Sequence, residues 1–216
     1  MKWDEVGSRL YETGTRKGVL YPMASDGTYG EGVAWNGLTG VTQSPSGADE
    51  NALWADDIKY LSLRSREEFG GTIEAYTYPD EFAECDGSAQ IATGAYIGQQ
   101  PRKHFGFCYR TALGNDTQNE DYGYKLHIIY NATAAPSSKD YATINDSPEA
   151  ITFSWEFTTT PVEVEGFKPT AYICIDSTKA DATKLATLEA ILYGTEGQSA
   201  VAARLPLPAE IISTLS

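Results

Sequence analysis

Hydrophobic and polar positions alternate most regularly in the second half of the chain. Between Ile151 and Phe157, apolar and polar side chains follow each other with a period of two. This pattern is typical of a strand with one buried and one exposed face. Residues 171–176 (AYICID) are more apolar and predict a more central strand. Residues 149–194 therefore contain two strands, and the clearest helical pattern of the sequence follows them.

The helix is predicted at about residues 181–193. Ser177, Thr178 and Asp181 are all residue types that cap a helix N-terminus. Gly194 is placed to end the helix in the left-handed conformation. One helix face is apolar, which indicates that it packs on a sheet. That face consists of Leu185, Leu188, Ile191 and Leu192.

Further strand patterns precede this segment, at residues 15–22, 58–63, 72–79, 103–113 and 122–130. The connections between them are rich in Gly and polar residues, and we expect residues 45–51 to be a mobile loop and residues 80–93 an irregular acidic connection. The pattern predicts a mainly β protein, a β-sandwich or barrel of about eight strands with one flanking helix and long loops.

The C-terminal residues read differently from the rest. We expect one β domain over residues 1–194, followed by a linker and C-terminal arm over residues 195–216, because Pro206 and Pro208 exclude a central strand there. The arm is expected to dock on a neighbouring subunit or on its own body, and to order on assembly. The candidate inter-subunit arm residues are Leu205, Pro206, Leu207, Pro208 and Ile211.

The charge narrows the classes of partner. The chain of 216 residues has 30 acidic and 16 basic side chains and a formal charge of −14. Residues 21–101 hold thirteen acidic and three basic side chains, a net charge of −10. Binding to nucleic acid or to anionic membranes depends on clustered Lys and Arg, so both are disfavoured. No apolar run approaches the ~20 residues that span a bilayer.

The N-terminus, the cysteines and the glycosylation sequons bear on the cellular compartment. Residues 1–6 have no apolar segment, so no signal peptide is expected. Three scattered cysteines are too few for a disulfide framework, which favours assembly in a reducing cytoplasm. In that compartment the sequons at Asn115, Asn131 and Asn145 are expected to be chance polar sequence.

Two kinds of chemistry have candidate residues. His104 and Cys108 lie four apart on a predicted strand, and a zinc site would need a further ligand from Cys85, His127 or Cys174. The usual close-spaced zinc pairs are absent, so a half-buried His and a small apolar Cys are the favoured interpretation.

A glycosidase would need two carboxylates, and tyrosines that stack on sugar would favour it. Tyr76 and Tyr78 alternate on a predicted strand beside a group of acidic residues. Acidic residues are abundant here, so such pairs arise easily. The candidate carboxylates are Glu74, Asp80, Glu81, Glu84 and Asp86.

Long stretches of the chain resemble one family. ADDIKYLSLRSREEFGGTIEAYTYPDEFAECDG (residues 55–87), NEDYGYKLHIIYNATAAPSSKDYATINDSPEAITFSWEFTTTPV (residues 119–162) and the closing ARLPLPAEI are similar to major tail proteins. These are the tail tube proteins of long-tailed phages and prophages of Gram-positive bacteria. The resemblance extends from the opening MKWDEVGSRLYETGTRKGVLYP to the final arm.

The resemblance implies a β-sandwich or barrel with a flanking helix, as in type VI secretion tubes. It implies a non-enzymatic structural subunit without cofactor or metal, which forms hexameric rings stacked into a tube that conducts the genome. The implied partners are other copies of the chain, a tail-tip or baseplate initiator, a tape measure protein and a tail terminator. The implied location is the virion tail, assembled in the host bacterial cytoplasm.

The acidic charge fits a channel for DNA, since a basic wall would hold the moving duplex by its phosphates. The alternatives are a β-sandwich module that binds carbohydrate or a receptor, and a glycoside hydrolase. The candidate lumen or interface residues are Glu67, Glu68, Glu74, Asp80 and Glu81.

Overall fold

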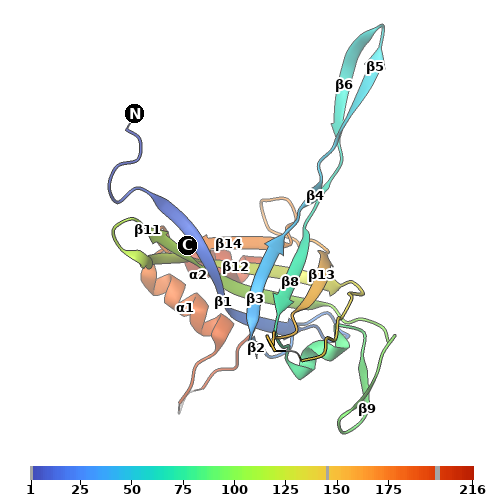
Figure 1. Ribbon diagram of the computed structural model, residues 1–216. Helices are drawn as coiled ribbons and strands as arrows, with labels where there is room; N and C mark the ends of the chain where they lie inside the picture. The colour runs from blue at the N-terminus through green and yellow to red at the C-terminus, as the bar shows by residue number, and fades with distance from the viewer. Residues whose placement is uncertain (1, 145, 198–199) are drawn as a thin grey trace.

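The centre of the fold is an eight-stranded antiparallel sheet (Figure 1). A computed structural model describes residues 2–144, 146–197 and 200–216. The strand order is β2-β1-β11-β12-β13-β8-β3, and β14 also pairs with β12. The strands of this sheet are β1 (Leu10–Pro22), β2 (Val33–Trp35), β3 (Leu38–Gln43), β8 (Gly70–Ala75), β11 (Phe105–Asn115), β12 (Asn119–Ala134), β13 (Phe153–Thr159) and β14 (Tyr172–Asp176).

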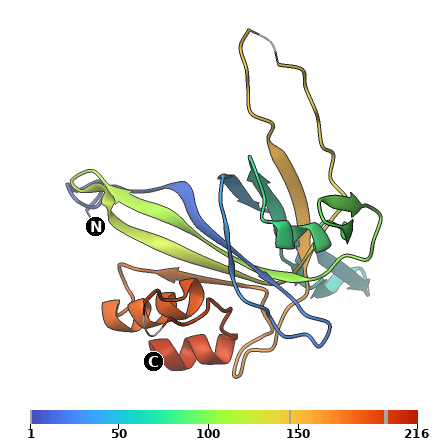
Figure 2. The same cartoon turned by 90° about the horizontal axis from the view of Figure 1, so that it is seen from below.

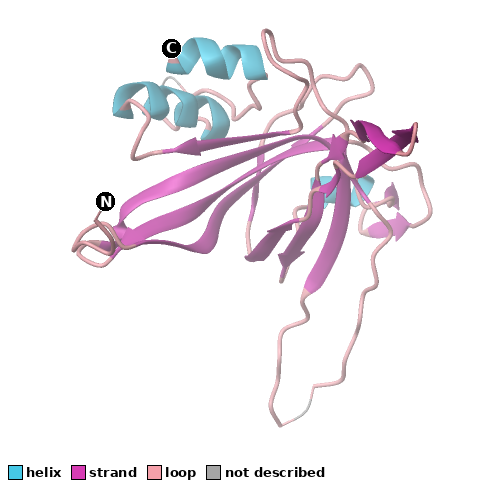
Figure 3. Ribbon diagram, turned by 90° about the horizontal axis from the view of Figure 1, so that it is seen from above, coloured by secondary structure: helices cyan, strands magenta, loops and turns pink. Residues whose placement is uncertain are grey.

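The sheet has two halves because β12 is long enough to pair with two strands along one edge. Residues 125–129 of β12 pair with β14, and residues 132–134 pair with β13. From β13 the order continues through β8 to β3. The other half, β1-β11-β12-β14, is called the four-stranded half below. Figure 3 shows the long strands of this half beneath two helices, with β13 and β8 at their far end.

Both faces are buried over residues 105–109 of β11 and 126–130 of β12, and the sequence is mainly apolar in these two stretches. One face contributes Phe107 and Ile129 to a core that also contains Trp35, Phe82 and Trp155. The rings of Trp35 lie 4.6 Å from Phe82 and 5.6 Å from Trp155, in tilted and edge-to-face arrangements typical of aromatic cores. The opposite face contributes Cys108, Leu126, Ile128 and Tyr130 to a second core under the helices (Figure 2).

The predicted helix is confirmed as α1 (Ala182–Tyr193). Asp181 caps it, because its Oδ1 accepts the N–H groups of Thr183 and Lys184 at 2.9 and 3.0 Å. Gly194 follows with φ 73° and ψ 178°, so its φ is positive as expected but its conformation is not the predicted left-handed helical one. A Cβ there would lie 2.7 Å from the Val201 carbonyl oxygen. The buried residues of the apolar face are Leu185, Leu188 and Leu192, and Ile191 is partly exposed.

The C-terminal arm ends in a second helix that the sequence analysis missed, α2 (Pro208–Leu215). Pro208 occupies its first turn, where a missing N–H costs nothing. The arm docks on its own body: the Tyr130 hydroxyl donates to the Pro206 carbonyl oxygen at 2.9 Å. Gly106 on β11 leaves room for Leu205, since a Cβ there would lie 2.2 Å from Leu205 Cδ2.

Three pieces lie outside the main sheet. A 3₁₀ helix, η1 (Asp80–Glu84), inserts Phe82 into the aromatic core, within a segment that the sequence predicted to be irregular. Residues 45–51, predicted to be a mobile loop, instead begin a long hairpin that projects from the sheet (Figure 1). The extra strands are β4 (Ser46–Gly47), β5 (Glu50–Ala55), β6 (Ile58–Arg64), β7 (Glu67–Glu68), β9 (Ala89–Ala92) and β10 (Ala95–Ile97).

Two sequence predictions fall partly on residues outside the described ranges. The third sequon residue, Asn145, lies outside them, as do residues 198–199 of the predicted linker. Asn115, of the first sequon, is buried and its side chain accepts the N–H groups of Thr117 and Gln118.

Candidate functional site

The two outer strands of the four-stranded half, β1 and β14, each have an open edge. Residues 10–16 of β1 pair with β11, while β2 covers the outer edge of β1 only at residues 18–20. The strand β14 pairs with β12, and within the described residues no strand pairs with its outer edge. Open edges present unpaired N–H and C=O groups and are sites at which another chain can add a strand.

The hydrogen bonds around β14 identify which of its backbone groups face outward. Tyr130 N–H donates to the Ala171 carbonyl at 2.9 Å, and Ser177 N–H donates to the Tyr124 carbonyl at 3.0 Å. In an antiparallel pair, hydrogen-bonded residues alternate with residues that turn their backbone groups away. The outward-facing positions of β14 are therefore Tyr172, Cys174 and Asp176.

Cys174 is the open position among these three. The side-chain hydroxyl of Thr170 donates to the Tyr172 carbonyl at 3.0 Å. The Asp176 carbonyl accepts the N–H of Ala180 at 3.0 Å. The middle of the β14 edge is thus the place where a further strand can bind.

Polar residues occupy the face of the four-stranded half opposite the helices. Glu12 Oε2 accepts Lys125 Nζ at 2.6 Å, and Glu12 Oε1 accepts the Thr111 hydroxyl at 2.5 Å. His127 Nε2 lies 2.9 Å from Thr111 Oγ1, and its ring stacks on Tyr109 with the centroids 4.6 Å apart. This cluster joins β1, β11 and β12 on one face.

The surroundings of the cluster shift the pKa values of Glu12 and His127, among others. Burial alone would raise the pKa of Glu12, but hydrogen bonds from Lys125 and Thr111 outweigh it and keep that pKa below its ordinary value. Burial lowers the pKa of His127, although the nearby Glu12 carboxylate acts in the opposite direction. His127 is therefore neutral at pH 7, and Lys125 and Glu12 form the charged pair of the face.

From the sequence, His127 was considered only as a possible zinc ligand, and Glu12, Thr111 and Lys125 were not selected. A signal for two residues of the cluster is present in YGYKLHIIY (residues 122–130), where Lys125 and His127 alternate with Leu126 and Ile128. That alternation indicates one polar and one apolar face. It does not indicate that Glu12, more than a hundred positions away, meets Lys125.

The projecting hairpin is the second exposed feature. It consists of β5 and β6 on a stem made by β4 and β7, and its residues are exposed apart from the half-buried Ala52. An isolated two-stranded hairpin is marginally stable in water. The exposed apolar side chains on it are Leu53, Trp54, Ile58, Tyr60, Leu61 and Leu63. Such a patch is typical of a surface that another molecule covers.

The predicted acidic residues do not form one group. Glu67 and Glu68 form β7 at the base of the hairpin, and Glu74 is exposed on β8. Asp80 and Glu81 lie in the first turn of η1. None of the five belongs to the four-stranded half, and their assignment to a lumen or interface stays a prediction.

The predicted arm residues divide into two sets. Leu205 and Ile211 belong to the core under the helices, and Pro206 and Pro208 are also buried. Leu207 is 55% exposed, and the neighbouring Ile212, which was not a candidate, is 41% exposed. Among the five candidates, Leu207 is accordingly the one that a neighbouring subunit could contact directly.

The residues considered for a zinc site have other partners. His104 Nδ1 lies 2.9 Å from Thr133 Oγ1, and the buried Cys108 lies 3.4 Å from the Tyr21 hydroxyl. Burial raises the pKa of the Cys108 thiol to about 12. Among the residues that the structure describes, no three His, Cys, Asp or Glu side chains come together as metal ligands would.

Two of the five carboxylates considered for a glycosidase form ion pairs. Asp86 is nearly buried and binds Lys139 at 2.6 Å and Arg102 at 3.4 Å. Glu84 binds Lys103 at 2.5 Å. Asp86 and Glu84 are therefore already bound to basic side chains of the same chain.

Over the described ranges, no helix has the length and apolar character needed to cross a lipid bilayer. Comparison with the models of known protein families and with curated proteins gives no match for this chain.

Proposed function

We propose that this protein is the structural subunit of a phage tail tube, which forms hexameric rings that stack into a hollow tube. The resemblance of residues 55–87 and 119–162 to tail tube proteins motivates the proposal. The observation that carries it is the pair of open edges, β1 and β14, on opposite sides of the four-stranded half.

Strand direction makes these edges complementary. The four strands are antiparallel throughout, so β14 runs opposite to β1. If copies join side by side in one orientation, β14 of one copy meets β1 of the next as a further antiparallel pair. Such a contact uses two different surfaces, and repeating it with a constant rotation closes a ring.

The ring has dimensions that suit a conduit. At about 4.8 Å between strands, six four-stranded halves close a wall about 37 Å wide between opposite backbones. The helices α1 and α2 thicken one face of each half, so that face lies outside and the face with Glu12 and Lys125 lies inside. With a net charge of −14, the subunit offers duplex DNA little electrostatic hold during ejection.

The other partners follow from the proposed role. Tape measure, tail-tip initiator and tail terminator proteins would contact the inner wall or the ends of the tube, and DNA would pass through without specific binding. The location would be the virion tail, after assembly in the host cytoplasm. The exposed hairpin would be covered by another copy of the chain.

Negative-stain microscopy of the concentrated protein tests the proposal. Rings or tubes at least about 60 Å across are expected, from a wall about 37 Å wide plus a helix layer about 10 Å thick on each side. Particles that remain monomeric at every concentration would contradict it. Monomers that bind oligosaccharide would instead support a carbohydrate-binding module.

A further inference from the structure

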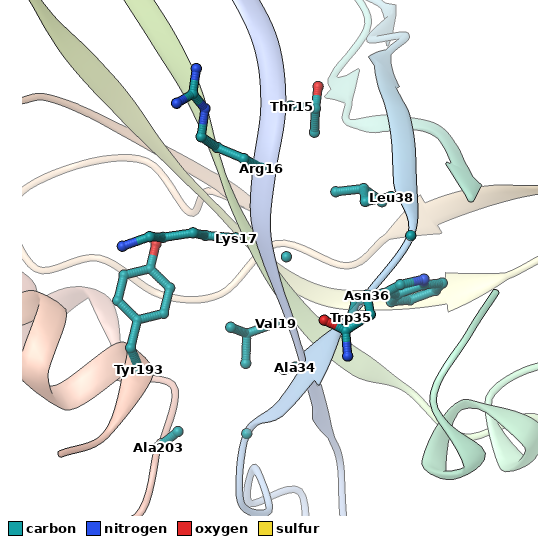
Figure 4. A pocket seen from close by; sticks show the side chains of 13 residues that line it. Thr15, Arg16, Lys17, Val19, Ala34, Trp35, Asn36, Leu38, Tyr193 and Ala203 are labelled. Carbon is teal, nitrogen blue, oxygen red and sulfur yellow. The ribbon is translucent and has the colours of Figure 1, made fainter. Parts of the chain in front are cut away.

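A cavity of about 650 Å³ lies between β1, β2 and β3, beside the end of α1 (Figure 4). The apolar residues that line it include Val19, Trp35 and Leu38, of which Val19 and Trp35 are buried. Its rim carries the exposed cations Arg16 and Lys17, and none of the described residues that line it is Asp or Glu. In a chain with nearly twice as many acidic as basic side chains, this is a local positive site.

The two cations of the rim differ in their partners. Arg16 binds Glu120 at 3.0 Å, outside the cavity lining. Lys17 has no ion pair within the described part of the chain, and its ammonium lies 5.6 Å from the centroid of the Tyr193 ring. Lys17 has φ 54°, which is uncommon for residues with a side chain. It lies at a bulge of β1, where the pairing with β11 shifts register between Arg16 and Val19. Its charge is therefore available to an acidic ligand.

The tip of the projecting hairpin has the opposite character. Asp56 and Asp57 form its two-residue turn with φ 53° and 62°. Turns of this kind favour Gly and Asn, so two adjacent carboxylates are an unusual choice. Neither carboxylate forms an ion pair among the described residues. Trp54 and Ile58, exposed by 68% and 62%, flank the turn with apolar surface.

The hairpin and the cavity lie at opposite ends of the same strand. Leu38, at the start of β3, lines the cavity, and the chain enters the hairpin after Gln43, at the end of β3. The stem and hairpin then extend away from the sheet (Figure 1), over about 40 Å at about 3.3 Å per residue. The tip cannot reach the cavity of its own chain, but it points toward that of a copy displaced along β3.

We propose that the cavity between β1, β2 and β3 receives the hairpin tip of a neighbouring copy, with Asp56 and Asp57 at Lys17 and Arg16. Trp54 and Ile58 then lie against the apolar side of the cavity, at Leu38. The contact is head-to-tail and does not close on itself, so it generates an open stack. The inference rests on the proposed tube function, and it assigns the contact between successive rings rather than the contact within one ring.

A charge-reversal experiment on the full chain tests the pairing. Lys17→Glu and Asp57→Lys are each expected to raise the concentration needed for tubes by about tenfold, and the double variant should restore most of that loss. Lys168→Glu makes the same charge change on an exposed loop and serves as control. Asp57→Asn retains a residue that tolerates the turn and removes only the charge. Circular dichroism establishes that each variant is folded.

Carbodiimide cross-linking of the unchanged protein gives a second measurement. In mixtures of isotope-labelled and unlabelled chains, we expect an amide link between Lys17 of one copy and Asp56 or Asp57 of another. Tubes that persist in all variants without this link would overturn the inference and leave the tube function intact. Absence of rings and tubes from the unchanged protein would overturn both. Rings that no longer stack in Lys17→Glu would support both.

Discussion

Lys125 Nζ lies 2.6 Å from Glu12 Oε2 and so joins β12 to β1 across the intervening strand β11. The pair lies on the face of the four-stranded half that the helices leave open, and each side chain is about one-third exposed. The Glu12 carboxylate is partly buried and accepts hydrogen bonds from the charged Lys125 and from the neutral Thr111 hydroxyl. This makes the pair a direct probe of whether that face is built as described.

Replacing Glu12 with Gln should lower the free energy of unfolding at pH 7 by no more than about 1 kcal/mol, since the pair is partly screened by solvent. The pKa of Glu12 is lowered in the folded state, so its contribution is present above the ordinary carboxylate pKa and is lost as the pH falls through the folded value. Urea unfolding between pH 7 and pH 3 should therefore show a smaller acid-side loss in Glu12→Gln. Glu5→Gln, in an exposed pair with Lys2, should leave the profile unchanged.

Phe82 is fully buried in η1 and touches the rings of Trp35, Phe105 and Trp155. Phe82→Ala should cost about 3–5 kcal/mol in unfolding free energy, because it opens a cavity in a rigid aromatic core. The control Phe167→Ala removes a side chain that is 76% exposed, and its effect should be small. Equal effects would contradict the role of residues 80–84 as part of the core.

Tyr130→Phe removes the buried hydroxyl that binds the Pro206 carbonyl. The expected loss is about 1–3 kcal/mol, because that carbonyl is left without its donor. Hydrogen exchange should show residues 205–215 protected in the unchanged monomer and less protected in the variant. Fast exchange of this segment in the unchanged monomer would instead support an arm that orders only on assembly.

Removing the hairpin separates folding from assembly. Ser65 N–H donates to the Asp49 carbonyl at 3.0 Å, so an Asn-Gly turn can replace residues 50–64. The hairpin contributes nothing to either core, and the shortened chain should unfold within about 0.5 kcal/mol of the original. Microscopy should find rings but no stacked tubes. A chain that no longer folds would show that the hairpin supports the body.

Periodicity and capping residues correctly predicted those elements whose formation depends on neighbouring residues in the sequence. The alternation from Ile151 to Phe157 became β13, and Asp181 with its leucine face became α1. The expectation that Pro206 and Pro208 exclude a strand is confirmed, but the same rules did not predict that Pro208 begins a helix. They also treated Tyr60 and Leu61 as ordinary strand residues, although both are exposed on the hairpin.

The candidate site was harder to predict because its parts are distant in sequence. A strand edge is open when no other strand pairs with it, and this depends on the topology of the whole sheet. The sequence of β14 alone does not indicate that β1 is the opposite outer strand of the same four-stranded half. Abundant carboxylates drew attention to Glu74 and Asp80. The structure instead points to the backbone of Cys174 and to the pair of Glu12 and Lys125.

The substitution Cys174→Pro tests the central claim, that β14 of one copy pairs with β1 of the next. Cys174 turns its backbone groups away from β12, so proline there removes an outward N–H and spares the existing ladder. Cys174→Ala, which keeps the N–H, is the matched control. Sedimentation velocity at high concentration should find hexamers for the control and folded monomers for Cys174→Pro. Hexamers that form equally well in both variants would contradict the account.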